Sequence, residues 1–455
     1  MLFNSLQFFI FFPVVTGLYF FLPHRRRWLL LLIASCIFYM AFIPAYILIL
    51  FATIIVDYFA GLYIEKAQGK KRRLLLIVSL ISNLGFLAFF KYYAFIGGNV
   101  AGLLQLLHWN YSLPALSIIL PIGLSFHTFQ AMSYTIEVFR GNQRAERHFG
   151  IYALYVMFYP QLVAGPIERP QNLIHQFKEV HYFERARVIS GLKQMLWGFF
   201  KKIVIADRAA LLVDSVYNNP AGHSGLPLII ATILFAFQIY YDFSGYSDIA
   251  IGAARVMGFK LMDNFNRPYA ALSVQDFWRR WHISLSTWFK DYVYIPLGGS
   301  RVGRTRHYFN LFVVFLLSGL WHGAAWTFVI WGALHGAYVV VSTASKVWRA
   351  KIVSLARLAR VPKFHQTLKT AFTFCLVTFA WIFFRANTLS DARYIISHSL
   401  TGLAATFSSL GALVHSLPSF LKPMSLICAL SPIALFAVRP LNMVEKEIFP
   451  CQVSA

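Results

Sequence analysis

A histidine inside a long apolar stretch is the main candidate for chemistry in this sequence. His322 lies in FNLFVVFLLSGLWHGAAWTFVIWGALHGAY, from Phe309 to Tyr338, and its small neighbours are Ser318, Gly319, Gly323, Ala324 and Ala325. Small side chains allow a backbone or a ligand to approach closely. An ionisable group at membrane depth is costly, so it indicates a functional site that faces a cavity or a pathway. A structural histidine bonded to a neighbouring helix is the alternative.

A second histidine, His282, lies in the aromatic sequence LSVQDFWRRWHISLSTWFKDYV, from Leu272 to Val293. Ser273 and Asp276 have the spacing of a capping box, which predicts that a helix begins there. Helical spacing then places His282 on an aromatic, inward face. In one interpretation the helix lies in the membrane interface and His282 is structural. In the other, His282 lines the same cavity as His322.

Other polar and aromatic residues could assist these histidines. Asp242 and Ser244, in YYDFSGYSDIAIG, are expected at the end of a span, where Asp242 could orient a histidine or a substrate hydroxyl. Acids at a membrane boundary can equally cap and solvate a helix end. Trp278 and Trp321, close in sequence to the two histidines, are candidates for contact with substrate. His127 and His335 are expected to be structural.

A glycine pair and three arginines suggest a place for an anion. The sequence Pro296 to Ser300, PLGGS, precedes Arg301, Arg304 and Arg306. Such a turn could hold a phosphate, although a loop between two elements is the favoured interpretation. The arginines could hold the phosphates of a coenzyme, or they could only fix topology and bind lipid head groups.

Several common catalytic sites have no support in the sequence. It contains no GxSxG, Walker or HExxH motif and no histidine followed five positions later by aspartate. This removes the sequence basis for a serine hydrolase, an NTPase, a zinc protease and a soluble HxxxxD acyltransferase. The four cysteines form no CxxC pair, so neither a metal site nor a disulfide framework is expected.

The composition predicts the elements that position these residues. With 58% hydrophobic and 13% charged residues over 455 positions, the chain is expected to be an all-α polytopic membrane protein with about ten or eleven spans. The chain has a net charge of +24, and its basic residues form short clusters between apolar runs. This pattern indicates that they set the orientation of the spans in the membrane and contact anionic lipid. No repeat or linker divides the chain. One domain is expected, with N-terminal spans in 1–148, a catalytic core in 149–345 and C-terminal spans in 346–455.

Basic residues on both sides of the His322 stretch suggest that its two ends lie on the same side of the membrane. Arg301 to His307 precede it, and a second basic cluster from Lys346 to Arg360 follows it. By the positive-inside rule, both ends are cytoplasmic. Two full crossings need about 40 residues plus a turn. We therefore expect a re-entrant pair or two short tilted helices, with Ser318 to Gly323 deep in the membrane at the bend.

The remaining apolar segments alternate with basic loops. The expected spans are Leu2–Leu22, a hairpin Trp28–Ile64 interrupted at Pro44, Leu74–Ile96, Leu116–Phe139, Val188–Val213, Leu226–Tyr241, Leu368–Phe384, Tyr394–Leu413 and Met424–Val438. Gly97 to Pro114 contains no lysine or arginine and is expected to be an outer loop. Phe149–Ala164 has basic residues at both ends, which predicts a re-entrant or interfacial segment.

The three most distinctive motifs resemble the membrane-bound O-acyltransferases, in particular the bacterial branch that acts in alginate O-acetylation and teichoic acid D-alanylation. They are QIYYDFSGYSDIAIG, NFNRPYAALSVQDFWRRWHISLSTWFKDYVYIPLGGSR and SGLWHGAAWTFVIWGALHG, and YPQLVAGPIERP also matches. The resemblance implies a ring of helices around a thinned core, with His322 as the principal catalytic residue and His282 as a second histidine at the tunnel. It also implies acetyl-coenzyme A as donor, a periplasmic acetyltransferase partner, a polysaccharide acceptor and the bacterial inner membrane.

Three functions are therefore compatible with the sequence. The first is O-acetylation of an extracytoplasmic polysaccharide, either an exopolysaccharide such as alginate or a cell-wall glycan. The second is D-alanyl transfer to teichoic acid, which would take the acyl group from a carrier protein. The third is a transporter of a polysaccharide or lipid-linked sugar, with His322 as a proton relay.

Overall fold

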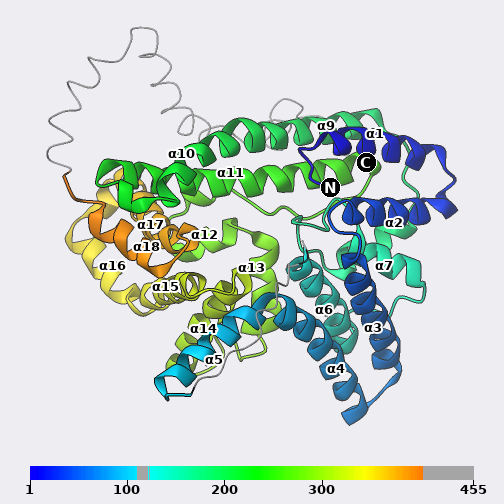
Figure 1. Ribbon diagram of the computed structural model, residues 1–455, viewed down its shortest axis with the longest axis horizontal. Helices are drawn as coiled ribbons and strands as arrows, with labels where there is room; N and C mark the ends of the chain where they lie inside the picture. The colour runs from blue at the N-terminus through cyan, green and yellow to red at the C-terminus, as the bar shows by residue number, and fades with distance from the viewer. Residues whose placement is uncertain (110–120, 122, 403–455) are drawn as a thin grey trace, which may run out of the picture. The chain divides into compact units, whose positions relative to one another are not determined.

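A computed structural model describes residues 1–109, 121 and 123–402 of the chain, and throughout these ranges the regular structure is helical with no strand (Figure 1). Five of the described helical segments are long and apolar enough to cross a membrane: Tyr46–Lys66, Gly69–Leu106, Leu226–Met257, Trp326–Ala344 and Pro362–Arg385. Leu6–Phe21 is a shorter apolar helix. The expectation of an all-α polytopic membrane protein is confirmed, and several expected spans correspond to shorter or interrupted helices.

The chain divides into two compact units. Of the described residues, the first contains Met1–Phe199 and Phe243–Val377, and the second contains Phe200–Asp242 and residues 378–402. Both candidate histidines, His282 and His322, belong to the first unit.

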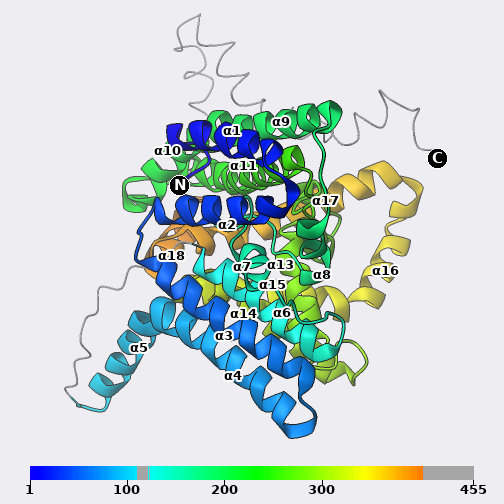
Figure 2. The ribbon, with the colours of Figure 1, turned by 90° about the vertical axis from the view of Figure 1, so that its right-hand side faces the viewer.

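The first part of the chain forms antiparallel helices, of which α3 and α4 lie side by side (Figure 2). The expected interruption at Pro44 is confirmed, since α2 ends at Met40 and α3 begins at Tyr46. The bounds are α1 Leu6–Phe21, α2 His24–Met40, α3 Tyr46–Lys66, α4 Gly69–Leu87, the π-helix η1 Ala88–Tyr92, α5 Tyr93–Leu106, α6 Leu124–Arg140, α7 Phe149–Met157, α8 Pro170–Leu173, η2 His175–Lys178 and α9 Arg185–Phe199.

The prediction of an outer loop at Gly97–Pro114 is partly wrong, because helix α5 continues to Leu106. The sequence YAFIGGNVAGLLQL contains two adjacent glycines but no proline, and its leucines continue the apolar pattern. Residues 110–114 lie outside the described part of the chain.

Helix α7 lies inside the first unit. Every residue from Gly150 to Met157 is buried. The sequence predicted either a re-entrant or an interfacial segment at Phe149–Ala164. A helix lying on the membrane surface would expose one face to lipid, so the burial of α7 favours the re-entrant alternative.

Helix α11 corrects the expected end of a span near Tyr241. It runs from Leu226 to Met257, straight through the polar motif YYDFSGYSDIAIG. Two of the polar residues find partners inside the protein, which allows the helix to continue: Gln194 donates to Asp248 at 3.2 Å, and the side-chain amide of Asn264 donates to buried Ser247 at 3.4 Å. The glycines of this segment let α9 approach closely, since a Cβ on Gly198 would lie 2.6 Å from the carbonyl oxygen of Gly245.

The remaining helices include the His322 hairpin and the C-terminal helices. Their bounds are η3 Phe200–Ala206, α10 Asp207–Tyr217, η4 Pro220–Gly222, η5 Pro268–Ala270, α12 Val274–Arg280, α13 Ile283–Phe289, η6 Lys290–Tyr294, α14 Arg304–His322, α15 Trp326–Ala344, α16 Lys346–Leu355, η7 Leu358–Arg360, α17 Pro362–Arg385 and α18 Leu389–His398. Helix α17 covers the expected span Leu368–Phe384. The expected span Tyr394–Leu413 is described only to residue 402, and Met424–Val438 lies outside the described residues.

Candidate active site

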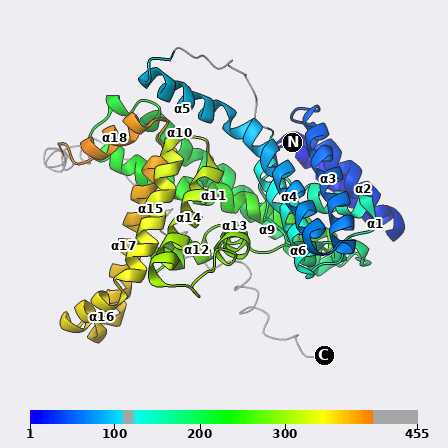
Figure 3. The ribbon, with the colours of Figure 1, turned by 90° about the horizontal axis from the view of Figure 1, so that it is seen from below.

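His322 is the last residue of α14, at the tip of a helical hairpin. Helix α15 begins at Trp326 after a short turn and returns antiparallel to α14, side by side with it (Figure 3). The expected bend is confirmed, but the two helices are longer than expected. Each has 19 residues, or about 28 Å of helix. His322 therefore lies about 24 Å of helix away from Arg306, at the far end of the hairpin from its basic flanks.

The glycines near His322 hold the hairpin together. A Cβ on Gly319 would lie 3.0 Å from the Cα of Gly332, and a Cβ on Gly332 would lie 2.5 Å from the carbonyl oxygen of Phe315. Any side chain at either position would force the two backbones apart. The close approach that the small residues predict is therefore made by the backbone of α15, which fixes the direction in which α14 ends.

Aromatic rings support the His322 imidazole. Its centroid lies 4.9 Å from the Trp321 ring and 5.0 Å from the Trp331 ring. Trp331 in turn lies 5.0 Å from His335, and the indole N–H of Trp278 donates to Nδ1 of His335 at 3.2 Å. The structure thus places Trp278 in the packing that supports the hairpin, where it contacts His335.

His282 lies at a break between two short helices. The prediction of a single helix over Leu272–Val293 is wrong, because α12 ends at Arg280 and α13 begins at Ile283. The predicted start is confirmed, since the Ser273 side chain accepts from the backbone N–H of Asp276. His282 itself has left-handed backbone angles, φ 44° and ψ 56°. Such strain in a non-glycine residue costs about 1–3 kcal/mol and is frequent at active sites.

The segment beginning at Asn264 causes the break. The carbonyl oxygen of Asn264 accepts from the N–H of Ile283 at 2.9 Å, and the N–H of Asn266 donates to the carbonyl oxygen of Arg280 at 2.9 Å. These two bonds replace helical hydrogen bonds on either side of His282. Another segment of the chain therefore turns the histidine inward, and the residue is only 1% exposed.

Asn264 also fixes the tautomer of His282. Its side-chain Oδ1 accepts from the backbone N–H of Ser284 at 3.2 Å and from the Ser284 hydroxyl at 2.9 Å. A backbone N–H can only donate, so this oxygen is an acceptor. The same oxygen lies 3.2 Å from Nδ1 of His282, which must therefore carry the hydrogen. The lone pair of a neutral His282 is then on Nε2, which is buried and has no hydrogen-bond partner in the described part of the protein.

The structure brings both histidines to one aromatic cluster. Trp321 contacts both, since its ring centroid lies 6.2 Å from that of His282 and 4.9 Å from that of His322. Phe243 and Phe126 complete the surroundings of His282, at 4.6 and 6.1 Å. His282 is buried in this cluster and His322 is half-buried, so the two imidazoles share largely aromatic surroundings.

Asp242 and Ser244 have different surroundings. Asp242 belongs to the second unit, where its Oδ1 forms an ion pair with Lys202 at 2.8 Å, and Lys202 also pairs with Asp207 at 2.9 Å. The carboxylate is thus bound to a lysine. Ser244 belongs to the first unit, and its hydroxyl is buried without a partner among the described residues.

The glycine turn before α14 closes the end of η6. The N–H groups of Gly298 and Gly299 donate to the carbonyl oxygens of Ile295 and Tyr294 at 3.0 and 2.9 Å, so neither is available to a phosphate. Buried Asn310 donates to the carbonyl oxygen of Gly299 at 3.2 Å. The interpretation as a loop between elements is confirmed. The side chains of Arg301, Arg304 and Arg306 are exposed beyond it.

A cavity of about 400 Å³ lies between the broken helix and α14. It extends to Ser318, one helical turn before His322, and Trp278 also lines it. Two exposed cationic residues, Arg279 and Lys290, contribute to its lining. A cavity with an apolar interior and a cationic rim matches a ligand with a reactive apolar end and an anionic end.

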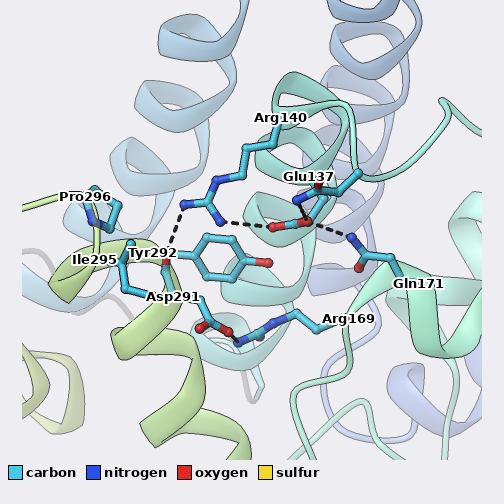
Figure 4. A pocket seen from close by; sticks show the side chains of 9 residues that line it. Glu137, Arg140, Arg169, Gln171, Asp291, Tyr292, Ile295 and Pro296 are labelled. Atoms are coloured by element: carbon cyan, nitrogen blue, oxygen red, sulfur yellow. Dashed lines mark hydrogen bonds and ion pairs between the residues drawn. The ribbon is translucent and has the colours of Figure 1, made fainter. Parts of the chain in front are cut away.

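A second cavity, of about 500 Å³, contains neither histidine (Figure 4). In it Tyr292 lies between the guanidinium groups of Arg140 and Arg169, 5.0 and 4.7 Å from its ring centroid. Arg140 is paired with Glu137 at 3.2 Å and Arg169 with Asp291 at 3.1 Å. Carboxylates therefore neutralise both arginines, and this cavity offers little net charge to an anion.

Two residues of this site escaped the sequence analysis. Asn264 lies in the motif NFNRPY, and no periodicity or spacing distinguishes it from the neighbouring Asn266. Lys91 could have been recognised from the sequence, because a lysine inside an apolar run such as Leu74–Ile96 indicates a functional role. Its ammonium group donates to the carbonyl oxygen of Trp321, directly before His322.

Comparison with known proteins identifies the family to which this chain belongs. Residues 127–386 match the membrane-bound O-acyltransferase family. A probable alginate O-acetylase AlgI from Pseudomonas aeruginosa is 40% identical over 401 residues, which cover 86% of this chain and 73% of that protein. A peptidoglycan O-acetyltransferase from Helicobacter pylori is 38% identical over 435 residues, covering 87% of this chain and 79% of that protein. A teichoic acid D-alanyltransferase from Bacillus subtilis is 27% identical over 256 residues, covering 52% of this chain and 62% of that protein. The chain therefore belongs to the membrane-bound O-acyltransferase family and is an acyltransferase.

Proposed function

We propose that this protein takes an acetyl group from cytoplasmic acetyl-coenzyme A and passes it across the bacterial inner membrane for O-acetylation of an extracytoplasmic polysaccharide. The final acceptor is an exopolysaccharide such as alginate or a cell-wall glycan, and the hydroxyl that first receives the acetyl group belongs to a sugar or to a partner protein. A periplasmic acetyltransferase partner completes the transfer to the polymer. The names of the two more similar relatives, an alginate O-acetylase and a peptidoglycan O-acetyltransferase, support this substrate class.

The observation that carries the proposal is that buried His282 and half-buried His322 both contact the Trp321 ring, at the far end of the hairpin from its basic flanks. His322 takes the proton of the acceptor hydroxyl as its oxygen attacks the thioester carbon. The carbon–sulfur bond then breaks, His322 returns that proton to the sulfur, and coenzyme A leaves as the thiol. His282 presents the lone pair of Nε2 to the same site, where it orients the hydroxyl or the protonated imidazole. The aromatic rings exclude water and so suppress hydrolysis of the thioester.

The proposed function can be tested by supplying the acyl donor on only one side of the membrane. In vesicles of known orientation, acetyl transfer is expected when acetyl-coenzyme A is supplied at the cytoplasmic face and not when it is supplied only at the opposite face. Transfer with donor at the opposite face alone would refute the proposed direction. A D-alanylated carrier protein, supplied in place of acetyl-coenzyme A, tests the teichoic acid alternative. Movement of a glycan without acyl transfer would instead support the transporter.

The arginines before α14 are expected to contribute to donor affinity. Replacing Arg301, Arg304 and Arg306 together by glutamine should raise the KM for acetyl-coenzyme A by roughly threefold to tenfold, because exposed cations attract its phosphates. The difference from the wild type should shrink at high salt as screening weakens the attraction. The measurement is the KM at two salt concentrations.

Two matched variants show which cations act. Replacing exposed Lys351, Arg357 and Arg360 by glutamine removes the same charge from the other flank of the hairpin and should leave the KM unchanged. Replacing Arg279 and Lys290 tests the cavity that extends to Ser318. If the KM rises only when Arg279 and Lys290 are replaced, the donor phosphates bind at the rim of the cavity. Arg301, Arg304 and Arg306 then only set the membrane topology and contact lipid.

A further inference from the structure

A lysine inside an apolar helix contacts the end of the helix that carries His322. Lys91 lies in η1, the π-helical segment Ala88–Tyr92 that joins α4 to α5 within the candidate span Gly69–Leu106. About 27 Å of helix separates it from the basic cluster at Arg73, similar to the distance between His322 and Arg306. A charged residue at such a position is costly and indicates a functional role. Single π-helical turns inside longer helices are frequent at functional sites.

The contacts of Lys91 are inside the protein. Its Nζ donates to the carbonyl oxygen of Trp321 and, at 3.2 Å, to the hydroxyl of Ser125. It also lies 5.6 Å from the Trp321 ring centroid. No carboxylate forms an ion pair with it among the residues that the structure describes. A lysine that only reached for water at the membrane surface would point its ammonium group outward. This one is directed to the C-terminus of α14.

The neighbouring residue makes a matching contact. The Tyr92 hydroxyl donates to the carbonyl oxygen of Leu320 at 2.5 Å, so consecutive residues of η1 bind consecutive carbonyl oxygens of α14. The last carbonyl groups of a helix have no partner within it, and they carry its partial negative charge. Farther along, Asn99 of α5 accepts from the indole N–H of Trp326 at 2.8 Å, at the start of α15. The segment from Lys91 to Asn99 thus contacts both sides of the turn.

We propose that Lys91 is a positioning residue, which holds the last turn of α14 and with it the imidazole of His322 in the geometry that acyl transfer requires. The inference rests on the proposed role of His322. The carbonyl oxygen that Lys91 binds belongs to the residue before His322, so loss of the contact would free the end of the helix at the catalytic residue. A shift of about 1 Å in a reacting group can cost about 10²-fold in rate.

The experiment measures kcat and KM separately for three variants of the full-length protein in vesicles. Lys91→Met keeps the length of the side chain and removes its charge and hydrogen bonds. Its kcat is expected to fall by about 10- to 100-fold with a KM within about threefold of the wild type. Lys91→Arg keeps a cationic donor and is expected to recover at least about half of that loss on a logarithmic scale. Lys71→Met, which removes an exposed lysine from α4 of the same helical segment, is the control and should behave like the wild type.

Each outcome decides the proposal. A wild-type kcat for Lys91→Met would overturn it, as would a loss that only follows the amount of folded protein and is not recovered by arginine. If Lys91→Met is not recovered from membranes, Tyr92→Phe takes its place, because it removes only the hydroxyl that binds Leu320. A lower kcat with unchanged KM in that variant supports the proposal, and unchanged kinetics contradict it. Full activity of His322→Ala would refute the proposed function itself, whatever the result at Lys91.

Discussion

Replacing His322 with alanine is expected to lower acetyl transfer by about 10²- to 10⁴-fold, because the change removes the group proposed to take the proton of the attacking hydroxyl. The fold should survive, since the imidazole lies at the tip of the hairpin and the α14–α15 contact depends on Gly319 and Gly332. The measurements are the acetyl content of the glycan in a complemented deletion strain and the turnover of acetyl-coenzyme A by the purified protein.

Two further variants make this result specific. His322→Gln keeps a side chain of similar size that cannot take a proton, and it is expected to be as inactive as the alanine variant. His175→Ala removes a histidine whose side chain is 57% exposed and should retain full activity. Normal acetylation by either His322 variant would remove the residue from the mechanism. A melting temperature far below that of the wild type would show that the loss of activity comes from unfolding.

The hairpin shows what charge and residue size can predict. Basic clusters at both flanks were sufficient to predict a return to the same side, and the small residues around His322 correctly located the bend. They could not give the lengths of the helices, because the positive-inside rule reports only the side on which a loop lies. The contact between Gly319 and Gly332 decides how the two helices pack, and that contact depends on their pairing in space.

Two elements could not be predicted, because their form depends on partners far away in the sequence. The apolar periodicity around His282 continues without interruption, and the break comes from backbone hydrogen bonds with Asn264 and Asn266. Helix α11 passes through a motif that is polar enough to end a span, because buried partners such as Gln194 bind its side chains. In both cases tertiary contacts outweigh the local pattern.

The other large effect is expected at Asn264. Replacing it with leucine removes the acceptor for Nδ1–H of His282 and for two groups of Ser284. The hydrogen of a neutral His282 is then free to move to Nε2, which would no longer offer a lone pair to the site. We expect kcat to fall by about 10- to 100-fold, in line with the loss of other groups that orient a functional histidine. Buried donors left without a partner should also cost about 1–3 kcal/mol of stability.

A matched variant separates these two consequences of the change at Asn264. Asn310 is an equally buried asparagine whose side chain binds the carbonyl oxygens of Leu297 and Gly299 and has no recorded hydrogen bond to His282 or His322. Asn310→Leu should therefore lower the melting temperature by a similar amount and leave the kcat of the folded protein near the wild-type value. Equal kcat losses in the two leucine variants would show that Asn264 matters only for stability.

Asn264→Asp tests the tautomer directly. The carboxylate still accepts from Nδ1 of His282 and from Ser284, and it loses only the weak bond to the Ser247 hydroxyl at 3.4 Å. This variant should therefore keep much more activity than Asn264→Leu near neutral pH. A neighbouring negative charge favours a protonated imidazole, so the acidic limb of its pH–rate profile should move to higher pH. If aspartate is as harmful as leucine at every pH, Asn264 does not act by holding the hydrogen on Nδ1. If it restores kcat and shifts the profile, the lone pair on Nε2 of His282 is the feature that the fold of this site provides.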